Sequence, residues 1–170
     1  MARAGGAMAR EAVGLLGVEN PRARVLEIGF GPGVGIAVLS RVLPNGEIIG
    51  VDPSDVSHRN AAARNSGAIA RGSVVLLSGT AQALPLPDAH CDAAIFVDNL
   101  HFWPDPLAGL AEVRRVLQAG SPVLCAFTPP SGGPPSRLRL LFEAAGFVEI
   151  AEHESTNGYL LRAVHPALVE

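Results

Sequence analysis

The chain has 170 residues, of which 48% are apolar and 17% are charged, with 19 glycines and 14 prolines. This composition is too apolar for a disordered chain and fits one globular domain, which we expect to span residues 1–170. The formal net charge of −3 provides no basic field for a nucleic acid or an anionic membrane, so we expect a small-molecule partner and neither of those two.

No stretch reaches the roughly 18 apolar residues that a membrane span requires, and no apolar run of signal-peptide length follows the first ten residues. We therefore expect a cytoplasmic protein. The histidines show no metal-ligand spacing with one another or with the two cysteines, so no metal site is expected.

Short apolar runs alternate with segments of helical period, which is typical of a parallel sheet covered by helices on both faces. After an N-terminal helix within residues 1–20, the predicted strands are 24–29, 47–52, 73–78, 91–97 and 122–128. The predicted helices are 34–43, 55–70, 106–117 and 137–145. Asn157 and Gly158 provide a turn between the runs 148–153 and 159–164, so the chain should end in a hairpin. The fold class is α/β.

The segment VLEIGFGPGVG, residues 25–35, is an apolar strand that runs directly into four glycines and then into a helix. Glycines at such a turn let the backbone approach a ligand, and the helix that follows presents free N–H groups. A nucleotide-like ligand is implied, although a turn that binds nothing is the alternative. A dinucleotide fingerprint needs a third glycine where Val34 or Ile36 stands.

Asp52 ends the second predicted strand, about 20 residues beyond the glycine turn, where a carboxylate can accept hydrogen bonds from both ribose hydroxyls. NAD enzymes and methyltransferases share this position, so Asp52 supports adenosine binding without choosing between them. A helix cap is the alternative role, because Pro53 and Ser54 follow.

With Glu27 ahead of Gly29, Gly31 and Gly33, the first segment resembles motif I of class I S-adenosylmethionine-dependent methyltransferases, an acidic residue followed by G-x-G-x-G. Residues 78–106, SGTAQALPLPDAHCDAAIFVDNLHFWPDP, are similar to a run in the type 11 family, the relatives of quinone-biosynthesis methyltransferases. The resemblance covers residues 12–164. It implies a Rossmann-like class I methyltransferase fold, a mostly parallel seven-stranded sheet in the order 3-2-1-4-5-7-6 with helices on both faces.

The resemblance also implies S-adenosylmethionine as the cofactor. In the family, the position of Thr80 is usually an aspartate that bonds the adenine amino group; a hydroxyl brings no charge, so weaker cofactor binding is a hypothesis to test. The residues expected to bind the cofactor are Glu27, Gly29, Phe30, Gly31, Gly33, Asp52, Pro53, Thr80, Ala81 and Val97.

His101 follows the fourth predicted strand at its carboxyl end, where open α/β sheets bind their ligands. Histidine is the side chain that most often serves as a general base, so His101 is the candidate general base, with Asp98 the next catalytic candidate. Packing beside Trp103 is the alternative role for His101.

The function implied is methyl transfer from S-adenosylmethionine to a small-molecule acceptor, at oxygen or carbon. We expect oxygen or carbon rather than nitrogen. Methylation of nucleic-acid bases is disfavoured because Asp98, Asn99 and Leu100 stand where enzymes that methylate amino groups of nucleic acids and proteins commonly carry a [DNS]-P-P-[YFW] motif. The alternatives are an S-adenosylmethionine-binding protein without turnover and a nicotinamide oxidoreductase. Many members of the family have an N-terminal helical lid; we expect no extended lid here, and an open site unless a second subunit of a homodimer covers it.

Overall fold

The computed structural model describes residues 2–167, which build one seven-stranded sheet in the order β3-β2-β1-β4-β5-β7-β6. Strands β1 to β5 run parallel to one another, and β7 is antiparallel to both β5 and β6. The predicted fold class and strand order are confirmed. The strands are β1 (Arg24–Ile28), β2 (Glu47–Val51), β3 (Val74–Leu77), β4 (Ala93–Val97), β5 (Pro122–Phe127), β6 (Val148–Ser155) and β7 (Gly158–Val164).

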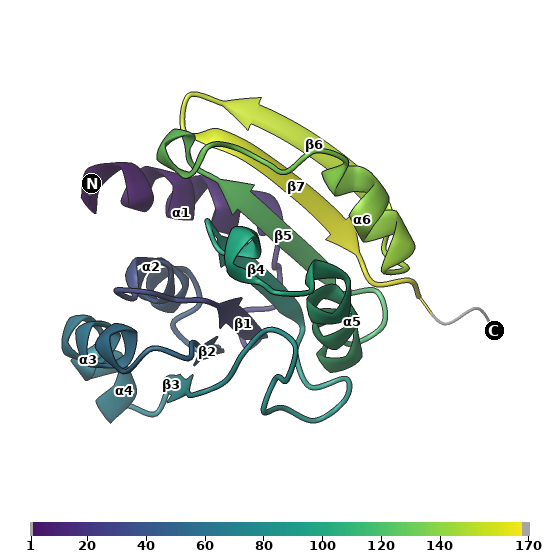
Figure 1. Ribbon diagram of the computed structural model, residues 1–170. Helices are drawn as coiled ribbons and strands as arrows, with labels where there is room; N and C mark the ends of the chain where they lie inside the picture. The colour runs from purple at the N-terminus through teal and green to yellow at the C-terminus, as the bar shows by residue number, and fades with distance from the viewer. Residues whose placement is uncertain (1, 168–170) are drawn as a thin grey trace.

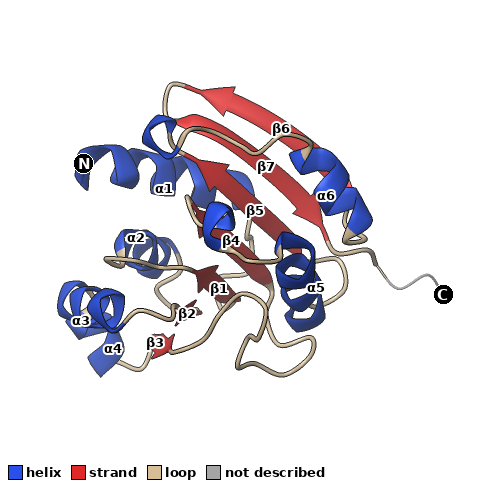
Figure 2. Ribbon diagram, viewed as in Figure 1, coloured by secondary structure: helices blue, strands red, loops and turns tan. Residues whose placement is uncertain are grey.

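Helices cover both faces of the sheet, as Figures 1 and 2 show. Helices α1 (Ala2–Leu16), α2 (Val34–Val42), α3 (Asp55–Arg64) and α4 (Ser66–Ala70) lie on one side, and α5 (Pro106–Val116) and α6 (Leu138–Ala144) lie on the other. A separate cluster of buried apolar side chains fills each interface, which explains why the central strands read as continuous apolar runs. None of the helices within residues 2–167 has the length and apolar character needed to cross a membrane.

The predicted helix over 55–70 was wrong in one respect, since the structure contains two helices that meet at Asn65. The backbone of Asn65 leaves the helical region with φ −111° and ψ 21°. Its buried side-chain amide donates hydrogen bonds to the carbonyl oxygens of Gly33, at 3.1 Å, and Ala61, at 3.0 Å. Local bonds of this kind compete with the helical ladder. The break therefore ties α3 and α4 to the glycine turn.

The predicted strand over 91–97 is two residues shorter in the structure, because β4 begins at Ala93 and Cys91 forms only an isolated bridge with Leu117. The connection from β3 to β4 is held by Arg115 of α5. Its guanidinium group donates to the carbonyl oxygens of Leu84 and Leu86, at 3.2 and 2.9 Å. These contacts hold the middle of the connection, and its first residues, 79–82, line a cavity.

Candidate functional site

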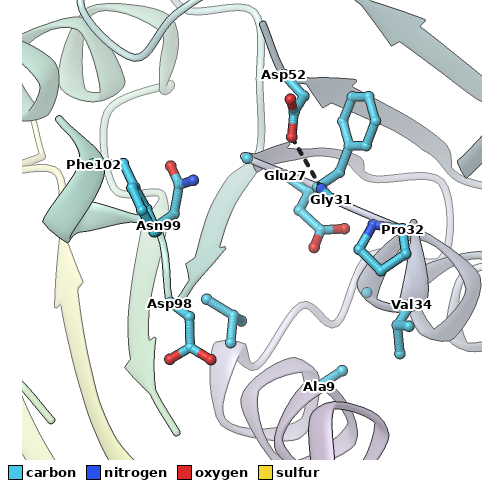
Figure 3. Close-up of a pocket in the computed structure, with 13 residues that line it drawn as sticks. Ala9, Glu27, Gly31, Pro32, Val34, Asp52, Asp98, Asn99 and Phe102 are labelled. Atoms are coloured by element: carbon cyan, nitrogen blue, oxygen red, sulfur yellow. Dashed lines mark hydrogen bonds between the residues drawn. The ribbon is translucent and has the colours of Figure 1, made fainter. Parts of the chain in front are cut away.

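A cavity of about 350 Å³ opens at the carboxyl ends of β1, β2 and β4, the edge at which parallel sheets bind ligands. Figure 3 shows Glu27, Gly31 and Asp52 on one side of it and Asp98, Asn99 and Phe102 on the other. Helix α1 contributes Ala9. The remaining lining residues are Gly29, Phe30, Pro32, Val34, Gly35 and Val97.

A second cavity of about 230 Å³ adjoins the first, and the two share Gly29, Asn99 and Phe102 as lining residues. We call the two cavities together the groove. The second cavity is formed by the ends of β1 and β2, by the chain after β3 and by the segment that precedes α5. Its other lining residues are Ile28, Val51, Pro53, Gly79, Thr80, Ala81, Gln82, Trp103 and Pro104.

The glycine turn between β1 and α2 requires glycine for conformation and for space. Gly29, Gly31 and Gly33 all have positive φ, at 67°, 48° and 77°. A Cβ atom on Gly33 would lie 2.6 Å from Nδ2 of Asn65 and 2.9 Å from Cα of Ala61. The turn can therefore pack against α3 only with glycine at position 33.

Glu27 lies at the bottom of the first cavity with only 5% of its surface exposed. Its Oε2 atom has no hydrogen-bond partner among residues 2–167. Burial, and then repulsion from Asp52, raises the pKa of Glu27 to about 8, against the smaller opposite effect of the Ile36 backbone N–H. In the protein without ligand the carboxyl group is therefore mostly protonated at neutral pH, and it has an unused oxygen.

Asp52 organises the turn that surrounds it. Its Oδ2 atom accepts a hydrogen bond from the Gly31 N–H at 3.0 Å, and its Oδ1 atom accepts one from the Ser54 N–H at 2.8 Å. The residue that caps α3 is Ser54, whose side chain accepts from the Ser57 N–H. Asp52 is therefore not the cap of this helix. Each carboxylate oxygen can accept a further hydrogen bond from a ligand.

The structure places the two catalytic candidates differently. Asp98 lines the first cavity, but both its oxygens accept hydrogen bonds from Thr128, from the backbone N–H at 2.7 Å and the hydroxyl at 2.6 Å. His101 lines neither cavity of the groove. Its Nε2 atom lies 2.9 Å from the Gly133 carbonyl oxygen, and its ring centroid is 4.9 Å from that of Phe127.

The hydrogen bond to Gly133 requires a proton on Nε2, because a carbonyl oxygen can only accept. His101 thus joins the chain after β4 to the loop after β5, outside the groove. Its role as a general base stays a hypothesis, and the contact to Gly133 gives the side chain a structural role that needs no proton transfer.

The residues expected above to bind the cofactor or to act in catalysis do not include Asn99, Phe102 or Ala9, although all three line the first cavity. Asn99 follows β4, so the rule that singled out Asp98 and His101 covers it as well. Phe102 is 78% exposed at the rim of both cavities. Ala9 carries no signal in the sequence, because small residues on an amphipathic helix are usually packing residues. Among residues 2–167 there is no group of three or more metal-ligating side chains.

The methyltransferase domain family matches residues 26–125 of the chain. An uncharacterised methyltransferase of Bacillus subtilis, YdaC, is 28% identical over 134 residues, which make up 74% of this chain and 72% of YdaC. A fatty-acid O-methyltransferase of Mycolicibacterium smegmatis is 32% identical over 71% of this chain and 43% of its own length. Several other curated relatives are matched over 29–46% of their length, so the chain spans less than half of those proteins.

The crystal structure of an S-adenosylmethionine-dependent methyltransferase from Aquifex aeolicus has the same fold, with a TM-score of 0.77 and 19% identity over 91% of this chain and 87% of that one. The family match covers β1 to β5, which include the glycine turn, Asp52 and the β3–β4 connection. The chain therefore belongs to the S-adenosylmethionine-dependent methyltransferase family, with S-adenosylmethionine as its cofactor.

Proposed function

We propose that the chain transfers a methyl group from S-adenosylmethionine to a small-molecule acceptor, at oxygen or carbon. The observation that carries the proposal is the buried, unpartnered oxygen of Glu27 in the same cavity as the Asp52 carboxylate. A buried carboxyl group without a partner is costly, and a cationic ligand group removes that cost. The relative named a fatty-acid O-methyltransferase supports an oxygen acceptor.

The residues of the groove fit this cofactor. Glu27, once deprotonated, would hold the amino group of the methionine part in the first cavity. Asp52, at the end of β2, would accept hydrogen bonds from the ribose hydroxyls. The apolar walls of the second cavity, Val51 and Pro53 among them, would cover the adenine, with the Thr80 hydroxyl and the Ala81 N–H at its edge.

The bound cofactor supplies a methyl carbon already activated by a sulfonium centre. The residues of this chain therefore have mainly to orient the methyl acceptor and to exclude water. Phe102, exposed at the rim of both cavities, is placed to cover a ligand in the groove. Both oxygens of Asp98 accept hydrogen bonds from Thr128, so the role of Asp98 is to hold the end of β5 beside the cavity. A general base is needed only when the group that receives the methyl is not already ionised or activated.

The direct test incubates the protein with methyl-labelled S-adenosylmethionine and a panel of small acceptors that includes fatty acids and hydroquinones. Transfer of the label to one acceptor supports the proposal. Cofactor binding at one molecule per chain with no transfer to any acceptor would favour the alternative, a cofactor-binding protein without turnover.

Replacing Asp52 by alanine is expected to weaken S-adenosylhomocysteine binding by roughly 1.5–3 kcal/mol, because charge-assisted hydrogen bonds to the ribose are lost. Isothermal titration calorimetry measures the change. Asp55→Ala is the matched control, since Asp55 is an exposed carboxylate in the first turn of α3 and lines neither cavity. Unchanged affinity in a folded Asp52→Ala protein would leave Asp52 with only its contacts to Gly31 and Ser54.

A further inference from the structure

Asn99 stands where the two cavities of the groove meet. It lies between β4 and the 3₁₀ turn Leu100–Phe102, and it lines both cavities. The site assignments above give it no role. A ligand that extends from one cavity into the other must pass its side chain.

The orientation of the Asn99 amide is fixed by the chemistry of its neighbour. Nε1 of Trp103 lies 2.6 Å from Oδ1 of Asn99. An indole N–H can only donate a hydrogen bond, so the amide atom that faces it must be the oxygen. The NH2 group then points away from the indole, and it has no hydrogen bond to any residue within 2–167. Asn99 therefore presents a hydrogen-bond donor to the groove and not an acceptor.

Gly29 leaves the space that this amide occupies. A Cβ atom on Gly29 would overlap the Asn99 side-chain amide, and the amide atom nearest to it would be Nδ2. The amide therefore lies directly over the backbone of the glycine turn. Figure 3 shows Asn99 across the cavity from Asp52 and Gly31, which places its NH2 group among the residues expected to bind the cofactor.

Residues that lie outside the groove fix the position of the Trp103 side chain. It is 7% exposed, and its ring centroid is 4.8 Å from that of Phe96. On the side of α5, a Cβ atom on Gly109 would overlap the six-membered ring of the indole. The core of the α5 face thus determines where the indole N–H points, and the indole N–H determines which way the Asn99 amide faces.

We propose that Trp103 is a positioning residue that holds Asn99 with its NH2 group toward the groove, where Asn99 donates a hydrogen bond to an oxygen of the cofactor, in its ribose or its carboxylate. This inference rests on the proposed cofactor groove and adds one donor to it. Asn99 donates the bond to the ligand. Trp103 also lines the second cavity, but its part in this bond is to orient Asn99.

The test measures S-adenosylhomocysteine binding by calorimetry for the wild type, Asn99→Asp, Trp103→Phe and the double variant. Aspartate has the shape of asparagine and keeps an acceptor for the indole, but it replaces the NH2 donor with an oxygen. We expect Asn99→Asp to weaken binding by about tenfold or more. The donor is lost, and a carboxylate oxygen of the variant then faces the oxygen of the cofactor that had accepted the bond. Trp103→Phe should weaken binding less, because phenylalanine keeps an aromatic ring in the wall of the second cavity. The double variant should bind like Asn99→Asp, since the indole N–H has nothing left to orient once the donor is gone.

Phe147→Leu is the matched control for Trp103→Phe, because Phe147 is a buried aromatic residue in the same apolar cluster that lines neither cavity. It should lower stability and leave affinity unchanged. Titration with adenosine, which has the ribose but no carboxylate, shows which oxygen accepts the bond. A loss of adenosine affinity in Asn99→Asp assigns the bond to the ribose. A loss confined to S-adenosylhomocysteine assigns it to the carboxylate.

Trp103 is the only tryptophan in the chain, so its fluorescence reports the hydrogen bond directly. Its emission without ligand should be nearly unchanged in Asn99→Asp and should shift to the blue in Asn99→Leu, which has no acceptor. Asn99→Leu also replaces Asn99→Asp in the binding test if the latter does not fold.

Wild-type affinity in both folded Asn99 variants would overturn the inference while the proposed function stands. Fully additive losses in the double variant would overturn the positioning role of Trp103. If the wild type itself fails to bind S-adenosylhomocysteine, the proposed function falls and the inference falls with it.

Discussion

Glu27→Gln is expected to weaken S-adenosylhomocysteine binding by about 2–5 kcal/mol, because it removes one partner of a buried charge pair. Glutamine keeps the size and shape of the side chain but cannot become negative. The loss should grow as the pH rises toward about 8, where the wild-type carboxyl group ionises and the amino group of the ligand still carries its proton. Below that pH the wild type must release a proton to bind, so its affinity should rise with pH and that of the variant should not. Calorimetry across this pH range measures both effects.

The same substitution should change how stability depends on pH, in a direction that follows from the pKa of Glu27. In the unfolded chain this carboxyl group ionises near its ordinary value of 4.5, whereas in the folded protein it keeps its proton up to about 8. Between these values the folded state binds more protons, so the free energy of unfolding falls as pH rises, by at most about 1.4 kcal/mol per pH unit, and levels off above about 8.

Glu27→Gln removes this contribution and should flatten the dependence of stability on pH. Urea unfolding of both proteins at several pH values, without cofactor, measures the difference. If wild type and variant lose stability in parallel between about pH 5 and 8, Glu27 does not hold a proton in the folded protein, and the account of its burial is wrong.

Gly33→Ala should destabilise the protein by about 2–5 kcal/mol, because it adds a left-handed backbone penalty and an overlap with α3. The new Cβ atom would lie 2.8 Å from the Cβ atom and 2.9 Å from the Cα atom of Ala61, and neither can move aside without shifting α3. Thermal and urea unfolding measure the loss.

Gly31→Ala is the matched control two residues earlier in the same turn. Gly31 has φ 48°, and a Cβ atom there would meet no atom within 4 Å. It should therefore lose only the backbone penalty, about 1–2 kcal/mol. Equal losses at the two positions would show that the contact between Gly33 and α3 contributes nothing to stability.

The strands and the position of the groove could be predicted from local signals in the sequence, whereas the order of the strands followed only from the resemblance to the methyltransferase family. Apolar runs mark the strands, and the glycines and Asp52 immediately follow two of them, at the edge where parallel strands end. The hairpin of β6 and β7 was also predicted, but its turn lies one residue earlier than expected: Thr156 and Asn157 form the turn, and Gly158 pairs with Ser155 as the first residue of β7.

The directions of the side chains after β4 could not be predicted in this way. Asp98 has φ 50°, a left-handed conformation that is uncommon outside glycine, and it redirects the chain immediately beyond the strand. Spacing along the sequence therefore does not tell which of the following residues face the groove. His101 turns toward Gly133, whereas Asn99, which precedes the 3₁₀ turn, and Phe102, its last residue, line both cavities.

The break at Asn65 and the hydrogen bond from Gly31 to Asp52 depend on contacts between segments far apart in the chain. Asn65 interrupts a helix because its amide reaches Gly33, 32 residues earlier. Asp52 holds the glycine turn through Gly31, 21 residues earlier. Helix propensity and capping rules describe neighbours within a few residues, so neither contact has a local signature.

Calorimetric titration of the wild-type protein with S-adenosylhomocysteine, and separately with NADH, tests the central claim most directly. The groove, with Glu27 at one end and Thr80 at the other, predicts saturable binding of one S-adenosylhomocysteine per chain and much weaker binding of NADH. Binding of NADH in preference, or no binding of S-adenosylhomocysteine at millimolar concentration, would contradict it.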